Sequence, residues 1–331
     1  MGVLISVVIP NFNSSRTISA CLDSVFSSRF NNYEVIVVDD CSEDDSPEII
    51  KEFPCRLYRL EEHSGAAAAR NHGARKARGE IIFFTDSDCL LQPGTLERIR
   101  GFFESSKNGY ILGGTYTPLS QDRRFFSDFQ SVFIHYSETK HAESPDYIPT
   151  HAMAIKRSDF FDIGGFDAES LPILEDVEFS HRARQRGYRL LMDPGLQVAH
   201  IFNYDLLKSL KNGFRKSLYW TLYSLKRKDM MRDSGTASIE LKTHGVFYII
   251  EILLLYFALA SNYAISLPLL VLALLSDLYI NRRLFSAFYR AGGIFFALKS
   301  LMYYQFIYPL SVITGGGLGL LCYILKKGSS P

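Results

Sequence analysis

Short apolar runs that stop at polar residues alternate with helix-like stretches through the first quarter of the chain. The apolar runs cover residues 4–9, 33–38 and 79–84. The stretch to about residue 28 repeats apolar side chains every three or four residues, and residues 65–78 are rich in alanine. Runs that are apolar throughout suit strands covered on both faces, as in parallel sheets. The pattern therefore predicts an α/β domain with a parallel sheet and helices on each side.

Asparagine or aspartate follows each of these predicted strands. Asn11 comes after the first, Asp39 and Asp40 after the second, and Asp86 and Asp88 after the third. Because ligands of such sheets bind beyond the carboxyl ends of the strands, these side chains should meet at one edge. Each loop taken singly has another explanation, as a helix cap or a turn. Their shared position favours a binding site.

Asp86-Ser87-Asp88 carries the most specific chemistry at this edge. Two carboxylates one residue apart can hold a hard divalent cation such as Mg²⁺ or Mn²⁺, which usually keeps water and substrate phosphates as its other ligands. Arg70 lies on the preceding helix, where it is either a surface residue or a guanidinium placed for a diphosphate. The sequence thus points to a substrate that bears phosphate.

Paired glycines and paired acids follow in the next part of the chain. Gly164-Gly165 permits a tight loop with exposed backbone, or a simple turn. Glu175 and Asp176 open a predicted helix that ends at Gly187. Acids at this position complement the helix dipole, and the sharper interpretation makes Asp176 a general base that faces the metal site.

Two further strand predictions bring in a histidine. Residues 149–156 read as a strand and residues 190–200 as a final strand pair that ends in His200. The imidazole of His200 could complete the cation site begun by Asp86 and Asp88. The alternative is a structural histidine.

The character of the chain changes after residue 203. From Leu206 to Leu225 apolar side chains recur every three or four residues, and lysine or arginine takes most of the other positions. We expect a basic amphipathic helix with its linker over residues 203–235, suited to the headgroup region of an anionic leaflet. A helix packed on the catalytic domain is the alternative.

Two long apolar segments follow, over residues 246–280 and 294–325. Each is longer than one bilayer crossing requires, so each is either one tilted helix or a hairpin of two, which gives two to four passes over residues 246–325. Candidate breaks are Ser261-Asn262, Pro268, Pro309 and Gly315-Gly316-Gly317. An even number is preferred, because the basic residues at 226–232 and Lys326-Lys327 would then share the cytosolic side with the N-terminal domain.

Composition narrows the class of protein further. The 331 residues are 47% hydrophobic and 14% aromatic, which suits a chain that lies partly in a membrane. With 36 basic and 35 acidic residues there is no overall attraction to nucleic acid. The five cysteines have no paired or metal-binding spacing and favour free thiols in a reducing compartment, and no basic region of a signal peptide precedes the first strand.

Five motifs in order resemble the family-2 glycosyltransferases with the GT-A fold, over roughly residues 4–200. They are Val8-Ile-Pro-Asn-Phe-Asn13, Val37-Val-Asp-Asp-Cys-Ser42, Ala69-Arg-Asn-His-Gly73, Thr85-Asp-Ser-Asp88, and Glu175-Asp176 followed by Arg182. The resemblance implies a Rossmann-like GT-A nucleotide-sugar domain over residues 1–202, followed by the α-helical membrane region.

The resemblance also implies roles for particular residues. The nucleotide-sugar donor would contact Pro10, Asn11, Asn13, Asp39 or Asp40, Arg70, Asp86 and Ser87. Mn²⁺ or Mg²⁺ would be held by Asp86, Asp88 and, on the reading above, His200. Asp176 would be the catalytic base with Glu175 beside it, and Gly164, Gly165 and Arg182 would lie on the acceptor side.

Two departures from the family pattern refine this prediction. Cys41 stands where the family commonly has glycine, which should alter the turn that contacts the base. The Gln-x-x-Arg-Trp motif of processive synthases is absent from the sequence, whose sole tryptophan is Trp220. We therefore expect transfer of one sugar per acceptor rather than polymerisation.

The expected function is metal-dependent, inverting transfer from a UDP- or GDP-sugar to a lipid-linked acceptor, either polyprenyl phosphate or a polyprenyl-diphosphate saccharide. The catalytic domain is expected on the cytoplasmic face of a multi-pass membrane protein. A soluble acceptor, a non-catalytic nucleotide-binding membrane protein and a nucleotidyltransferase are the alternatives, and the last lacks a Gly-rich, lysine-bearing phosphate loop near the first strand. No motif specifies the sugar, the linkage or an oligomeric state.

Overall fold

A computed structural model of the chain describes residues 4–106, 109–169, 172–260 and 263–328, which fall into two compact units. The first unit comprises Met1–Arg123 and Glu138–Asn203, and the second comprises Arg124–Ser137 and Tyr204–Pro331. Arg124–Ser137, which the sequence analysis included in the catalytic domain, therefore belongs with the membrane-type helices. Its aromatic side chains explain this, because Phe129 stacks on Phe288 at 5.1 Å and meets Tyr303 edge-on at 4.8 Å.

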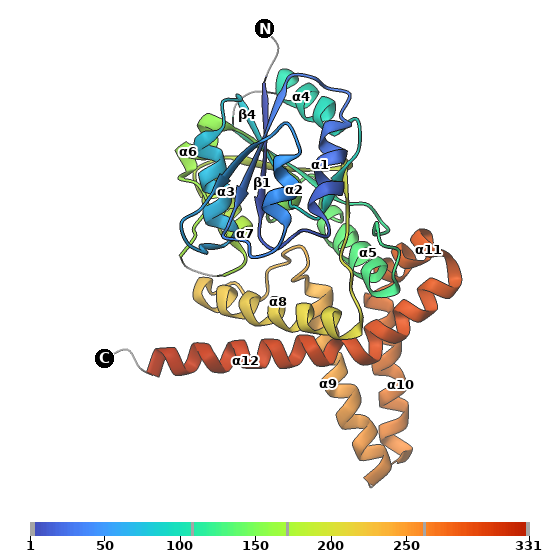
Figure 1. The fold of residues 1–331 in the computed structure, drawn as a ribbon. Helices are drawn as coiled ribbons and strands as arrows, with labels where there is room; N and C mark the ends of the chain where they lie inside the picture. The colour runs from blue at the N-terminus through green and yellow to red at the C-terminus, as the bar shows by residue number, and fades with distance from the viewer. Residues whose placement is uncertain (1–3, 107–108, 170–171, 261–262, 329–331) are drawn as a thin grey trace. The chain divides into compact units, whose positions relative to one another are not determined.

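Strands and helices alternate through the first unit (Figure 1). In chain order they are β1 (Ile5–Asn11), α1 (Ile18–Phe26), β2 (Tyr33–Asp39), α2 (Ser46–Lys51), β3 (Arg56–Arg59), α3 (Gly65–Lys76), β4 (Ile81–Phe84), β5 (Cys89–Leu91), α4 (Thr95–Ser105), β6 (Tyr110–Tyr116), a 3₁₀ turn (Thr150–Ala152), β7 (Met153–Lys156), α6 (Arg157–Ile163), α7 (Glu175–Gln185) and β8 (Arg189–His200).

These strands form one eight-stranded sheet in the order β3-β2-β1-β4-β7-β6-β8-β5. β1, β2 and β4 are parallel, as the sequence predicts, and β3, which was not predicted, is parallel to β2. In contrast, β7 runs antiparallel to both β4 and β6, and β5 antiparallel to β8. The sheet is therefore mixed rather than parallel, and the predicted α/β fold class is confirmed. The apolar run of β7 is buried on both faces, just as a parallel strand would be, so its composition does not reveal its direction.

Two other strand predictions need correction. β6 was missed because Gly113-Gly114 interrupts its pattern; a Cβ on Gly114 would lie 2.3 Å from the Leu196 carbonyl oxygen, so the neighbouring strand requires glycine there. Residues 190–200 form one bent strand rather than a pair. β8 pairs with β6 on both sides of an irregularity, and the Asp193-Pro194-Gly195 sequence lies within that bend.

The parallel half of the sheet brings the predicted polar residues together. Asn11 lies opposite Asp39 in the β1–β2 register, and β4 pairs with the other side of β1. The backbone N–H of Thr85, just after β4, donates to the Val8 carbonyl oxygen at 3.2 Å. The loops after β1, β2 and β4 therefore leave one edge of the sheet, where the sequence places the site.

The second unit is helical. It contains most of α5 (Phe125–Thr139) and then α8 (Leu206–Arg227), α9 (Ile239–Ala260), α10 (Tyr263–Ile280), α11 (Arg282–Met302), a π-helix (Tyr303–Ile307) and α12 (Tyr308–Gly328). Within this unit α9 and α10 pack side by side, and α8 packs along α12 (Figure 1). Three helical segments of the described residues are long and apolar enough to cross a membrane, namely Ile239–Ala260, Tyr263–Ile280 and Arg282–Leu325.

Most of the residues predicted to break the apolar segments lie inside helices. Pro268 lies inside α10, and Pro309 and Gly315–Gly317 lie inside α12, so none of them ends a helix. Ser261-Asn262 lies outside the described residues, although one helix ends before it and another begins after it. The side chains of Lys326 and Lys327 are also outside the described part of the chain.

A buried polar network joins α9, α10 and the π-helix. Asp277 accepts hydrogen bonds from Asn281 Nδ2 at 2.9 Å and Gln305 Nε2 at 2.8 Å, and its Oδ2 lies 2.7 Å from His244 Nδ1. The other ring nitrogen of His244 faces the Tyr304 carbonyl oxygen at 3.0 Å. Hydrogen bonds of a π-helix join residues five apart instead of four, so the Tyr304 carbonyl oxygen lacks its usual backbone N–H donor. The ring of His244 takes the place of that donor.

Removal of the central acceptor should destabilise this unit. In Asp277→Ala the buried donors of His244, Asn281 and Gln305 lose their common partner, which we expect to cost about 3–5 kcal/mol. Thermal unfolding of the full chain in detergent measures the loss. Ser276→Ala is the matched control, since that exposed hydroxyl bonds only the Leu272 carbonyl of its own helix. Equal melting temperatures for the two variants would contradict the stabilising role of the network.

Candidate active site

Asn11 at the end of β1 organises the first binding loop. Its side-chain amide donates to Asp39 Oδ1 at 2.8 Å and lies 3.0 Å from Ser46 Oγ and 3.2 Å from Ser42 Oγ. Asp39 is fully buried and also accepts from the Ser42 backbone N–H at 3.2 Å. Pro10, half-buried, precedes Asn11 in the same strand. The structure thus brings the predicted residues of this edge together and shows that Asn11 and Asp39 also hold the loops to each other.

Asp40 connects this edge to the start of α3. Its two carboxylate oxygens accept hydrogen bonds from the backbone N–H groups of Ser64 at 2.7 Å and Gly65 at 2.8 Å, and His63 Nδ1 lies 2.9 Å from Oδ2. N–H groups at a helix start have no partner within the helix, and a negative charge there is favourable. Asp40 therefore fixes α3 in place whether or not it also contacts a nucleotide base.

Two residues of these loops have left-handed backbone conformations. Asn13 has φ of 50° and Cys41 has φ of 64°. Asn13 also links the loops, since its Oδ1 accepts from the Glu43 N–H at 2.8 Å. The left-handed conformation costs a residue with a β-carbon roughly 1–2 kcal/mol, which gives a physical reason for the glycine that the resembled family commonly has at position 41.

Arg70 joins the two carboxylate pairs of the site. It is buried on α3, and its guanidinium donates to Glu175 Oε1 at 2.5 Å and to Asp86 Oδ1 at 2.6 Å. Burial alone would lower the pKa of Arg70, but Asp86 and Glu175 raise it above its usual value. A permanently charged fork therefore holds the end of β4 against the start of α7.

The two aspartates after β4 differ in their electrostatics. Burial raises the pKa of Asp86, but the adjacent Arg70 outweighs this and holds it below its usual value. Burial also raises the pKa of Asp88; His200 opposes that shift and the Asp86 charge adds to it, and the net result is a raised pKa. Ser87 lies between them, partly exposed, in the turn after the strand.

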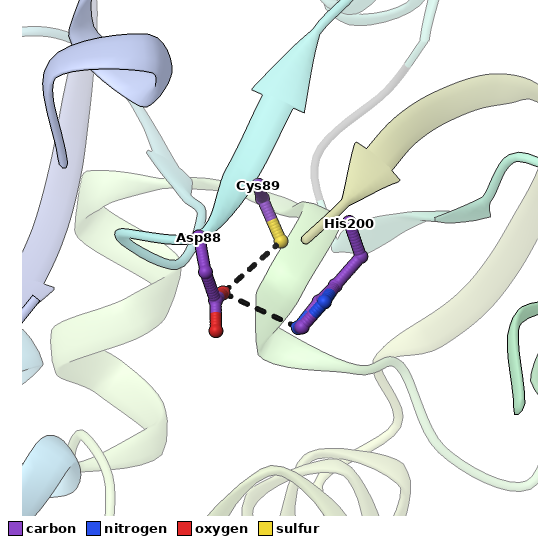
Figure 2. Close-up of side chains that lie close together, drawn as sticks. All are labelled: Asp88, Cys89 and His200. Atoms are coloured by element: carbon purple, nitrogen blue, oxygen red, sulfur yellow. Dashed lines mark hydrogen bonds and ion pairs between the residues drawn. The ribbon is translucent and has the colours of Figure 1, made fainter. Parts of the chain in front are cut away.

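Asp88, Cys89 and His200 converge from two strands. Figure 2 shows the three side chains pointing toward one another, with His200 Nε2 3.3 Å and Cys89 Sγ 3.8 Å from Asp88 Oδ1. The antiparallel register of β5 and β8 places Cys89 opposite His200. One donor atom from each residue lies within 4.8 Å of the others, a spacing at which a single metal ion could reach all three. Asp86, whose Oδ1 is taken by Arg70, is not in this group.

Asp176 lies at the start of α7, next to the residue that binds Arg70. Burial and the neighbouring Glu175 charge raise its pKa to about 7, against the smaller lowering effect of Arg70. A carboxyl group with a pKa near neutrality can take up a proton at physiological pH, which is what a general base requires. The left-handed Leu174, with φ of 77°, sets the chain direction at this point.

The predicted acceptor-side residues form a separate, tightly bonded loop. Gly164 and Gly165 have φ values of 102° and 70°. Arg182 donates to the carbonyl oxygens of Ile163 at 2.6 Å and Gly165 at 2.7 Å, and also pairs with Glu178 at 2.7 Å. The guanidinium of Arg182 is thus engaged in holding the loop.

The structure adds residues that the sequence did not single out. His151 is buried, stacks on Tyr116 at 3.9 Å, and places Nε2 3.5 Å from Glu138 Oε2. After burial and the charges named above, the His151 imidazole also lowers the pKa of both Asp86 and Asp176. His151 was visible only as part of the strand predicted over residues 149–156, and Tyr116 lies where the sequence carries no motif.

Comparisons with known proteins agree with this architecture. Residues 6–164 match the family model described as glycosyl transferase family 2. An uncharacterized glycosyltransferase of Haemophilus influenzae is 30% identical over 184 residues, 53% of this chain and 60% of that protein. Glycosyltransferase AglE of Haloferax volcanii is 30% identical over 233 residues, 66% of this chain and 74% of that protein. The alignment with the first of these relatives therefore spans less than two thirds of its length.

A solved structure shares the fold. Mannosyltransferase PcManGT from Pyrobaculum calidifontis, in complex with GDP-Man and Mn²⁺, superposes with a TM-score of 0.59 at 17% identity, covering 99% of this chain and 88% of that one. The mixed sheet, the motif order and the extended similarity to AglE lead to one conclusion: this chain has a GT-A fold and belongs to glycosyl transferase family 2.

Proposed function

We propose that the enzyme transfers one sugar from a UDP- or GDP-sugar to a membrane lipid-linked acceptor, with inversion at the anomeric carbon and with a divalent metal ion. One observation carries this proposal. The Arg70 guanidinium links Asp86, on the donor side, to Glu175, whose neighbour Asp176 has a pKa raised to about 7. The site thus combines a guanidinium group that can bind phosphate with a carboxyl group that can accept a proton.

The donor would lie over the loops after β1 and β2. Pro10, Asn11 and Asn13 would line the nucleotide pocket, and Asp39 or Asp40 would contact the base. Both carboxylates already accept hydrogen bonds from the protein, so such a contact would use their remaining lone pairs. GDP-Man in the PcManGT complex supports a nucleotide-sugar donor for a protein of this fold.

The donor atoms near Asp88 suit a divalent cation. Asp88 supplies a hard carboxylate oxygen and His200 an imidazole nitrogen 3.3 Å away, while the remaining positions suit phosphate oxygens and water. Asp86 would contact the sugar. It would also bind the metal ion if its carboxylate bridges Arg70 and that ion. Mn²⁺ or Mg²⁺, when bound, would neutralise the departing nucleoside diphosphate.

Asp176 would take the proton from the acceptor oxygen as that oxygen attacks the anomeric carbon. The Arg70–Glu175 pair fixes the start of α7 and so holds Asp176 at the site. Gly164, Gly165 and Arg182 would support the acceptor side through the loop that they build. An acceptor phosphate, already ionised, would need this base less than a sugar hydroxyl.

The helical unit supports a lipid acceptor. Its apolar helices are suited to a membrane, and the basic α8 is suited to an anionic surface, so an acceptor with a polyprenyl tail would reach the catalytic domain from the bilayer. We propose that the catalytic domain, predicted over residues 1–202 and in the structure without Arg124–Ser137, lies on the cytoplasmic face, where nucleotide sugars are made. A membrane anchor that serves a soluble acceptor is the second candidate.

A donor screen tests this function. The full chain in membranes that contain polyprenyl phosphate, or polyprenyl-diphosphate saccharide, is offered radiolabelled UDP- and GDP-sugars with and without Mn²⁺. We expect label in the lipid fraction with one donor and only with the metal. Label in a soluble product would support the second candidate, and no metal-dependent turnover of any donor would argue for a non-catalytic nucleotide-binding protein.

Asp176→Asn should nearly abolish transfer to a hydroxyl acceptor. Loss of a general base costs about 10²- to 10⁴-fold in kcat, while donor binding should change little, because Asn keeps the shape of the side chain. Single-turnover kinetics and donor titration separate the two effects. The exposed Glu169→Gln is the charge-matched control. Normal turnover would refute the assignment of the base, and a mild loss would point to polyprenyl phosphate as the acceptor.

The pH profile should report the raised pKa of Asp176. Below a pKa of about 7 the carboxyl group is protonated and cannot accept the acceptor proton, so kcat/KM for a hydroxyl acceptor should fall about tenfold per pH unit below 7 and level off above it. Rates from pH 5.5 to 8.5 at saturating metal and constant ionic strength measure this. A profile flat down to pH 5.5 would be incompatible with Asp176 as the base.

His200→Ala should weaken the metal site. Because one nitrogen ligand is lost, the Mn²⁺ concentration for half-maximal activity should rise at least about tenfold, with partial recovery of activity at high Mn²⁺. Metal titration of initial rates gives the value. His72→Gln, on α3 with its ring 5.6 Å from that of Tyr58 on β3, should leave the titration unchanged. An unaltered metal requirement in His200→Ala would make His200 structural.

A further inference from the structure

The glycines of α12 let it approach the backbone of α8. A Cβ on Gly315 would lie 2.3 Å from the Phe214 carbonyl oxygen, and one on Gly319 would lie 2.7 Å from the Leu218 carbonyl oxygen. In the other direction, a Cβ on Gly213 would lie 2.8 Å from Ser311 Oγ. Small residues spaced four apart are the usual means by which helices pack this closely in membranes.

The contacts also give the relative direction of the two helices. Gly213 meets Ser311, Phe214 meets Gly315 and Leu218 meets Gly319, so residue numbers rise together along both helices. α8 and α12 therefore run parallel and in contact over more than one helical turn. Whatever position α8 takes relative to a bilayer, α12 must take as well.

α8 is unsuited to crossing a bilayer. Lys208, Lys211, Arg215 and Lys226 are exposed and share one face of the helix, and they are separated by three, four and eleven residues. Several cations in the hydrocarbon core would each be costly, and α8 is not among the segments of the described chain that are apolar enough to span.

α12 has the complementary face. Four of its five exposed leucines, Leu310, Leu318, Leu321 and Leu325, lie eight, three and four residues apart and so form one stripe, beside the face that carries Gly315 and Gly319. The fifth, Leu320, is exposed outside this stripe. The pair thus has basic side chains on the outer face of α8 and leucines on the outer face of α12. The long segment Arg282–Leu325, apolar enough to cross as a whole, is also interrupted by Gly293 with φ of 76°.

We propose that α8 and α12 lie together in the plane of the membrane as a two-helix platform, and that α9 and α10 alone cross the bilayer among the described helices. The leucine stripe of α12 enters the acyl-chain boundary, and the basic face of α8 binds the headgroups of anionic phospholipids. The binding partner is therefore an anionic bilayer surface. The proposal is independent of which sugar or acceptor the catalytic domain uses.

Depth measurements along the helices test the platform. Nitroxide labels are placed singly at Leu310, Leu318 and Leu325 on α12, in a chain with Cys41→Ser, Cys55→Ser and Cys322→Ser, which removes the partly exposed thiols. The chain is reconstituted in phosphatidylcholine–phosphatidylglycerol vesicles. We expect all three at about 5–10 Å below the headgroups. Labels at Val246, Leu253 and Leu259, exposed on α9, are the control and should pass through the bilayer centre. An α12 label at the bilayer centre, with its neighbours shallower on opposite sides, would overturn the proposal.

Sidedness gives an independent readout. A membrane-impermeant maleimide is applied to each side of sealed vesicles that carry Lys226→Cys, Tyr263→Cys or a cysteine appended after Pro331, all in the chain without the three partly exposed native cysteines. We expect the appended cysteine and Lys226→Cys to react from the same side, and Tyr263→Cys from the other. Reaction of the appended cysteine together with Tyr263→Cys would mean a third crossing and would also refute the platform.

Substitutions in the basic face of α8 test whether the platform binds anionic headgroups. In the triple variant Lys208→Gln, Lys211→Gln and Arg215→Gln, the Leu318 label should become more accessible to a water-soluble relaxing agent in vesicles with phosphatidylglycerol. In pure phosphatidylcholine it should match the unsubstituted chain. Arg75→Gln with Lys76→Gln, exposed on α3, is the charge control. No difference between the two lipids in the unsubstituted chain would exclude anionic headgroups as the partner.

Discussion

The geometry of the first unit depends on one buried guanidinium group, that of Arg70. Arg70 lies on α3, and its two hydrogen bonds fasten the end of β4 to the start of α7, segments that are far apart in the sequence. Without a positive charge between them, Asp86 and Glu175 would be two buried carboxylates facing each other, an arrangement that favours protonation or separation. The strand end that carries Asp86 and Asp88 and the helix that carries Asp176 keep their spacing because this guanidinium lies between them.

The Arg70 guanidinium also gives the carboxyl groups of the site different pKa values. Asp86 contacts it directly and has a pKa below its usual value, whereas Asp176 is one residue beyond the direct contact and feels burial and the Glu175 charge more strongly. Similar side chains thus acquire different protonation behaviour from their positions relative to one arginine. Such divergence is a common property of sites that combine charge stabilisation with proton transfer.

The sequence predicted the features that depend on a local pattern of residues. It did not predict those that depend on which strands pair and in which direction. The strand ends at Asn11, Asp39 and Asp86 were predictable, because apolar runs stopped there and parallel strands share an edge. The direction of β7 was not, since a buried strand has the same composition in either direction. Cys89 entered the candidate cation site only through the β5–β8 register, and His151 only through its stack on Tyr116.

Asp40 gives α3 a second significance. Its carboxylate receives the first backbone N–H groups of that helix, and Arg70 projects from the same helix little more than one turn later. The loop that would read the nucleotide and the arginine that orders the carboxylates therefore belong to one rigid body. If Asp40 contacts the nucleotide base as proposed, a ligand that shifts Asp40 would shift Arg70 with it, so base recognition and the alignment of the carboxylates would be linked through α3.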